Sequence, residues 1–154
     1  DVEVYYNNLR YFLIADFNDN TNLYDTDIIE SVIKEIIAFN NTVTIIIKST
    51  INIGFTRFVR EKYNYEKIIF SPEFLREGHA LEDNLNPSRI IVGDESKEAK
   101  SFSELLAHGA NKASIDILHT SPESAECIKL FSNSLFSKTW SNKLDSSYWS
   151  VIKL

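Results

Sequence analysis

Two kinds of apolar segment alternate along the chain. Short runs of adjacent apolar residues, mostly β-branched or aromatic, lie at 11–15, 43–47, 67–70 and 89–92. Runs without polar alternation are typical of parallel strands that are buried on both faces. Between the first two runs, apolar residues recur at helical spacing over 28–37, and the Asp25-Thr26-Asp27 cluster is expected to cap that helix. Phe55, Phe58 and Val59 indicate another helix. This alternation predicts an α/β fold with a doubly wound sheet.

The pattern changes after Gly93. Residues 97–108 are typical of a surface helix, and 115–118 of a brief strand. A new helix is predicted to begin at Ser121-Pro122-Glu123, because serine is a preferred N-cap and proline suits the first helical turn. Its apolar face is expected to include Ile128, Phe131, Leu135 and Phe136.

Composition and charge exclude several classes of protein. The 154 residues are 44% hydrophobic and 25% charged, which is typical of a globular domain and excludes a disordered or membrane-embedded chain. A net charge of -6, with lysine and arginine scattered singly, argues against nucleic acid and anionic membranes as partners. The single cysteine, Cys127, favours a reducing, cytoplasmic setting and is expected to be a small packing residue. His79, His108 and His119 are dispersed, so we predict no metal site and regard His79 as a surface residue.

Candidate chemistry follows the second and third strands, because ligands of open parallel sheets bind beyond the carboxyl ends of the strands. Lys48, Ser49 and Thr50 follow one strand, and 71–78 follows the next. Glu73 and Glu77 are four residues apart, as are Lys129 and Asn133, so each pair would share one side of a helix. Spacing alone also fits solvated polar faces, and Thr50 alone would be taken for a helix cap.

The amino-acid sequence of three longer segments favours functional residues over solvated polar faces. Residues 47–56, 69–81 and 86–93 closely resemble the UDP-glucose 6-dehydrogenase family, and Pro-Ser-Arg-Ile-Ile-Val-Gly at 87–93 looks most like the UDP-glucose branch. Shorter similarities at 20–26 and 129–133 extend the resemblance to about residues 10–136. It implies the second half of a Rossmann-like parallel sheet with helices on both faces, followed by the start of a helical central domain. Residues 1–118 would then form a partial NAD-binding domain, and 119–154 the start of the central, dimerising domain.

The resemblance also implies an activity and site residues. The family oxidises UDP-glucose twice with NAD, giving UDP-glucuronate for polysaccharide synthesis. Thr50 and Glu77 match residues at the cofactor, and Glu77 matches the acid/base carboxylate that acts through water. The loop that holds the UDP-sugar corresponds to Glu73, Phe74, Leu75, Arg76 and Glu77. Lys129 and Asn133 match the pair facing the reacting carbon, where an ammonium can stabilise an oxyanion and an amide can position a water.

The sequence departs from the family in three places. Its four glycines stand alone, so the G-x-G-x-x-G turn that binds the pyrophosphate is missing, as is a Thr-Pro-Thr element after the first strand. The family's catalytic-cysteine segment is also missing, and Cys127 does not correspond to that cysteine. Residues 134–154 depart from the dimerising helix, which weakens the expectation of a homodimer. We therefore expect part of a dehydrogenase, inactive alone. The alternative is a non-catalytic remnant that binds a UDP-sugar or only associates with other subunits.

Overall fold

A computed structural model describes residues 16–18, 23–76, 78–112 and 114–139, and the expected strand at 11–15 lies outside these residues. The described elements follow one another as β1 (Asp16–Asn18), β2 (Leu23–Asp25), α2 (Asp27–Phe39), β3 (Ile45–Ile47), α3 (Phe55–Tyr63), β4 (Ile68–Phe70), α4 (Ala80–Leu85), β5 (Arg89–Val92), α5 (Lys97–Gly109), β6 (Asp116–His119) and α6 (Pro122–Thr139).

The central strands are parallel, as their apolar runs predict. Strand β3 pairs with β4 in the register Ile45 to Ile68, and β5 pairs with β6 in the register Arg89 to Asp116. The two pairs meet where Gly93 N–H donates to the Phe70 carbonyl at 2.8 Å. The carboxyl ends of β3, β4 and β5 therefore lie along one edge, which positions the site described below.

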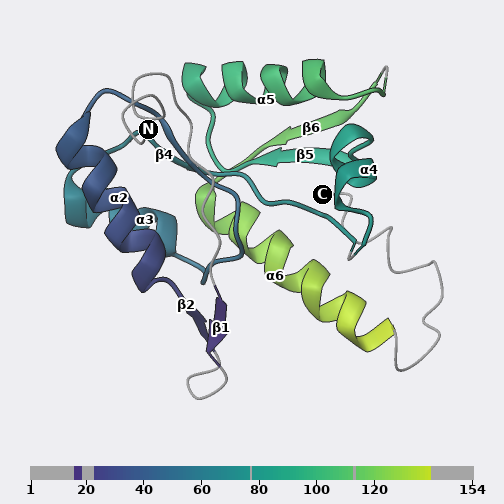
Figure 1. Cartoon of the computed structure of the whole chain (residues 1–154), viewed down its shortest axis with the longest axis horizontal. Helices are drawn as coiled ribbons and strands as arrows, with labels where there is room; N and C mark the ends of the chain where they lie inside the picture. The colour runs from purple at the N-terminus through teal and green to yellow at the C-terminus, as the bar shows by residue number, and fades with distance from the viewer. Residues whose placement is uncertain (1–15, 19–22, 77, 113, 140–154) are drawn as a thin grey trace.

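Helices cover both faces of these strands. On one face Ile45, Ile47 and Phe70 pack with α2, α3 and the Ala125 side of α6. On the other face Ile46, Ile69 and Val92 pack under α5, mainly against Phe102. Figure 1 shows α5 on one side of the strands and α2 with α3 on the other. Alternate residues of each buried strand pack into different apolar layers, one on each face of the sheet. This arrangement confirms the predicted α/β fold.

Three local features differ from the sequence-based expectations. Helix α2 begins within the predicted Asp25-Thr26-Asp27 cluster, with Thr26 as its N-cap, but the Thr26 side chain makes no capping hydrogen bond. Residues 71–76 contain neither helix nor strand, so Glu73 does not lie on a helix, and the short helix α4 follows instead. Strands β1 and β2 form an antiparallel hairpin that the apolar pattern did not indicate. By contrast, Ser121 Oγ accepts from Ser124 N–H at 3.2 Å, which confirms the predicted start of α6.

Candidate functional site

The loop after β4 begins at the carboxyl edge of the sheet. Ser71 N–H donates to the Ile47 carbonyl of β3 at 2.9 Å, and its hydroxyl donates to the Ile91 carbonyl of β5 at 2.8 Å. One buried residue thus fixes the loop to both neighbouring strands. The half-buried residues Glu73, Phe74 and Leu75 follow and line a cleft together with Lys48 and the 83–90 segment.

Lys129 of α6 reaches this loop from the opposite side. Its Nζ donates to the Glu73 carbonyl at 2.5 Å and lies 5.4 Å from the centre of the Phe74 ring. The backbone acceptor and the aromatic face together hold the ammonium over the loop. The structure therefore brings together three of the predicted site residues, Glu73, Phe74 and Lys129, across 56 residues of sequence.

A second half-buried lysine, Lys48, belongs to the same cluster. Lys48 follows β3, lines the cleft with Glu73, and places its Nζ 6.0 Å from the Phe102 ring centre. Burial lowers the pKa of both lysines, and the Glu73 carboxylate opposes that shift in each. For Lys48 the charge of Lys129 lowers the pKa further. Two desolvated ammonium groups therefore share one carboxylate at the carboxyl edge of the sheet.

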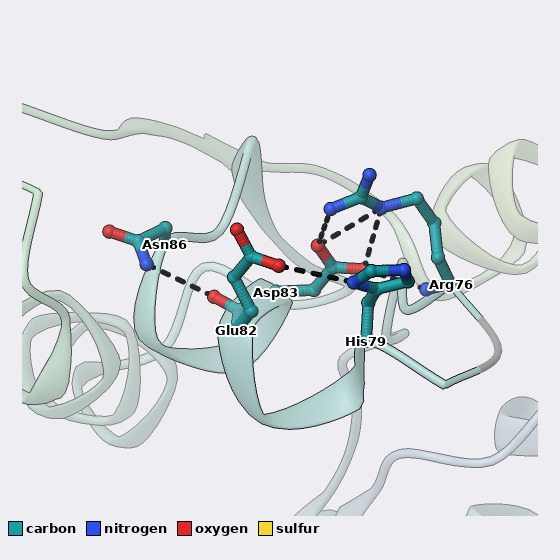
Figure 2. A network of polar contacts seen from close by, with 5 residues as sticks. All are labelled: Arg76, His79, Glu82, Asp83 and Asn86. Atoms are coloured by element: carbon teal, nitrogen blue, oxygen red, sulfur yellow. Dashed lines mark hydrogen bonds and ion pairs between the residues drawn. The ribbon is translucent and has the colours of Figure 1, made fainter.

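The far end of the loop is tied to α4. The Arg76 guanidinium donates to both carboxylate oxygens of Asp83, with Nη2 to Oδ1 at 2.7 Å, and Arg76 N–H donates to Oδ2 at 2.7 Å (Figure 2). Beside this pair, His79 Nδ1 lies 3.2 Å from Glu82 Oε2. These bonds from Arg76 hold the pKa of Asp83 at about 2. Arg76 thus restrains the loop, while Glu77 lies outside the described residues.

Among the described residues, Thr50 and Asn133 make no hydrogen bond or ion pair to this cluster. Thr50 is half-buried after β3, and Asn133 is half-buried one helical turn beyond Lys129. Next to Thr50, the buried Ser49 Oγ has no hydrogen-bond partner among the described residues. The Ser49 hydroxyl is therefore available to hydrogen-bond a cofactor at this edge. The glycine turn that would bind a pyrophosphate does not occur among the 154 residues.

Several expectations are revised or extended here. Cys127 is exposed on α6, so its prediction as a packing residue is wrong. His79 is exposed, as expected. Sequence reasoning missed the roles of Lys48 and Asp83. For Lys48 a signal existed, because it is two positions beyond Ile46 and so points to the α5 side.

Within the described ranges no cluster of metal-ligating side chains occurs, and none of the helices there is long and apolar enough to cross a membrane.

Comparison with known proteins assigns this arrangement to a family. Residues 16–108 match the family model described as the UDP-glucose/GDP-mannose dehydrogenase family, NAD binding domain. The chain belongs to this family. It is 44% identical over 131 residues to the UDP-glucose 6-dehydrogenase of Campylobacter jejuni, and 47% identical over 137 residues to that of Streptococcus pneumoniae. The matches cover 83% of this chain but 33% and 35% of those two enzymes, so the chain spans about a third of the length of these relatives.

Solved structures of dehydrogenases show the same fold. The GDP-mannose dehydrogenase of Pseudomonas aeruginosa superposes with a TM-score of 0.68 at 22% identity, covering 83% of this chain and 32% of that one. A UDP-glucose dehydrogenase of Pyrobaculum islandicum gives a TM-score of 0.65 at 24% identity, covering 79% and 30%. At this identity the likeness concerns the fold alone, and it supports the Rossmann-like assignment of the strands and helices above.

Proposed function

We propose that these residues form the core of the active site of a UDP-glucose 6-dehydrogenase, which oxidises UDP-glucose to UDP-glucuronate with NAD. The observation that supports this most directly is the Glu73 and Lys129 contact at the carboxyl edge of the sheet. A half-buried loop with a desolvated ammonium held against it suits a sugar whose hydroxymethyl group must be held and polarised. Residues 1–118 would supply the cofactor side and 119–154 the start of a central domain, in a cytoplasmic enzyme.

Lys129 would act on the reacting oxygen. Its ammonium is held by the Glu73 carbonyl and the Phe74 ring, so its position is set before substrate binds. In a buried place a positive charge interacts strongly with a developing alkoxide, because little water screens it. Thr50 is the residue that would lie beside NAD, and the bound cofactor would supply the acceptor for the hydride from C6. Asn133, one turn further along α6, would orient the hydroxyl or a water through its amide.

The proton would leave through a carboxylate. Glu77 is the residue that the family resemblance gives for this role, and we keep it as part of the proposal. Among the described residues, Glu73 is the carboxylate whose charge reaches both Lys48 and Lys129. It would keep the two lysines protonated and balance their charge while the oxyanion forms. In the sequence Glu73 and Glu77 flank Phe74-Leu75-Arg76, so the proposed site would have two carboxylates.

Calorimetry with UDP-glucose tests the site. We expect the 154-residue polypeptide to bind UDP-glucose more tightly than UDP, and Lys129→Met to weaken that binding by about tenfold, equivalent to about 1.4 kcal/mol. Lys34→Met is the matched control, since Lys34 is an exposed lysine of α2, and it should leave the affinity unchanged. Absence of UDP-glucose binding at about 1 mM, the weak end of specific affinities, would contradict a retained sugar site.

A second assay separates binding from turnover. With UDP-glucose and NAD present, we expect no formation of NADH by this polypeptide, because neither the glycine turn nor the family's catalytic-cysteine segment occurs in its sequence. Formation of NADH would show that the expectation of inactivity is wrong. Binding without turnover would also fit a non-catalytic relative that retains the UDP-sugar site.

A further inference from the structure

Glu126 of α6 is a fully buried carboxylate, 0% exposed, that the proposed chemistry does not use. Its Oε2 accepts from Gly54 N–H at 2.6 Å, and its Oε1 accepts from Thr56 N–H at 3.0 Å and from the Thr56 hydroxyl at 2.6 Å. Burial raises the pKa of Glu126, and these hydrogen bonds from Thr56 and Gly54 oppose the shift. A carboxylate in such a place is stabilised by its donors, so the contact has a defined geometry.

The start of α3 has no side-chain acceptor of its own, although Phe55 N–H donates to the Asn52 carbonyl at 3.1 Å. Its N-cap is Gly54, at φ 87°, which offers no side chain, and its first turn contains no acidic residue. The first N–H groups of a helix have no partner within the helix and carry partial positive charge. Glu126 supplies the missing acceptors from 70 residues further along the chain. The first turn of α3 is therefore completed by α6.

The position of Glu126 on α6 relates this contact to the site. Lys129 lies three residues further along the same helix, so the two side chains are on neighbouring positions of one face. The segment 48–54, which includes Lys48 and Thr50, ends at the turn that Glu126 holds. We propose that Glu126 is a positioning residue, which fixes α6 against the first turn of α3 and so sets where Lys129 lies relative to the 48–54 segment. This inference rests on the proposed function, in which Lys129 faces the substrate.

A matched control lies one turn earlier on the same helix. Glu123 also reaches α3, where its Oε1 is 2.6 Å from Arg57 Nη2, but the Arg57 side chain is 66% exposed. Exposed ion pairs contribute little to stability or positioning. Glu126→Gln and Glu123→Gln make the same chemical change, and only the first replaces an acceptor of buried N–H groups by an amide that carries hydrogens of its own.

NMR of the folded polypeptide tests the positioning directly. In Glu126→Gln we expect the amide signals of Gly54 and Thr56 to move, and the ring signals of Phe74 to move with them because Lys129 is displaced. The Phe74 ring centre lies 5.4 Å from Lys129 Nζ, so its signals respond to a displacement of the lysine. In Glu123→Gln the Phe74 ring signals should stay in place. Unchanged Phe74 signals in a folded Glu126→Gln variant would overturn the proposal.

The affinity for UDP-glucose, measured by calorimetry where every variant is folded, gives the functional readout. We expect a loss of about tenfold for Glu126→Gln and less than about twofold for Glu123→Gln. Should Glu126→Gln fail to fold, Thr56→Ala removes only the hydroxyl donor and should displace the Phe74 signals in the same way, though less. A lower melting temperature with unaltered affinity and Phe74 signals would mean a purely structural role, contrary to the proposal. If the unaltered chain binds no UDP-glucose, the proposed function fails while the Phe74 readout still decides the positioning.

Discussion

The environment of Lys48 is determined by its position at the end of a buried strand. In the sequence it is one lysine after a hydrophobic run, and such lysines are usually solvated. The alternation of a buried strand turns its side chain to the α5 side, beside Phe102 and the Glu73 loop. By contrast, Glu73, Phe74 and Lys129 were predictable because the motif resemblance includes them. The motif indicated that these residues belong to one site, but their contacts and the environment of Lys48 depend on how α6 and α5 pack against the sheet.

Replacing Lys48 should stabilise the fold. At pH 7 the ammonium is charged in the folded and unfolded states, so Lys48→Met removes a desolvation cost, and we expect the free energy of unfolding to rise by about 1 kcal/mol. Because burial lowers the folded-state pKa, this cost disappears as pH rises from that pKa towards the ordinary 10.5. The contribution of Lys48 to stability should therefore rise on the alkaline side in the unaltered chain, and this rise should be absent in Lys48→Met. Urea unfolding at neutral and alkaline pH measures both effects.

The control for this change is Lys34→Met, at an exposed position of α2. It should alter neither the stability at pH 7 nor its alkaline rise by more than about 0.5 kcal/mol, as for ordinary surface substitutions. A Lys48→Met variant less stable than the unaltered chain at pH 7 would mean that the attraction to Glu73 outweighs the desolvation of the ammonium.

At the scale of elements, the strands and helices with a regular apolar pattern were predicted better than the irregular segments. The runs at 67–70 and 89–92 became β4 and β5, and the helices α3, α5 and α6 begin within the predicted regions. The family resemblance predicted a loop over 73–77, whereas the short helix α4 was not predicted. Their conformation depends on Arg76 pairing with Asp83 across seven residues, and no apolar period marks such a pair.

The Arg76 and Asp83 pair makes a prediction about this loop. Because its hydrogen bonds hold the pKa of Asp83 at about 2, below the ordinary 3.8, Asp83 should remain mostly ionised at pH 3. Its contribution to stability is present above the ordinary value and is lost as pH falls through about 2. In Arg76→Gln the carboxyl should be mostly protonated at pH 3. The carbon-13 shift of the Asp83 carboxyl group reports the ionised fraction in each variant.

Glu82→Gln provides the comparison for that titration, since Glu82 contacts His79 rather than Arg76 (Figure 2). It should leave the Asp83 titration in place. An Asp83 that is already mostly protonated at pH 3 in the unaltered chain would show that the guanidinium does not hold this end of the loop in solution.

At the scale of the whole molecule, the sheet and the last helix meet at Gly93. Gly93 follows β5 directly, its N–H donates to the Phe70 carbonyl of β4, and it lies against the start of α6. Figure 1 shows α6 starting beside the ends of the strands and running away from them. From the sequence, Gly93 could be placed after the strand, but the element that packs against it could not be predicted. That contact depends on how α6 packs against β4, β5 and α3, which is a property of the assembled chain.

Glycine at position 93 should therefore be required for stability. A Cβ there would lie 3.0 Å from Pro122 Cα, 3.2 Å from Ala125 Cβ and 3.2 Å from the Phe70 carbonyl oxygen. Two of these neighbours are backbone atoms that cannot rotate away, so α6 would have to shift from the sheet. We expect Gly93→Ala to lower the free energy of unfolding by about 2 kcal/mol, typical of overpacking. Gly109→Ala is the matched control, because nothing lies within 4 Å of its added Cβ, and in α5 alanine should stabilise by up to about 1 kcal/mol. Equal stabilities of the two variants in urea would contradict the close packing of α6 on the sheet.

Because that packing also presents Lys129 to the Glu73 loop, Gly93→Ala should weaken UDP-glucose binding even where the variant remains folded, and Gly109→Ala should not.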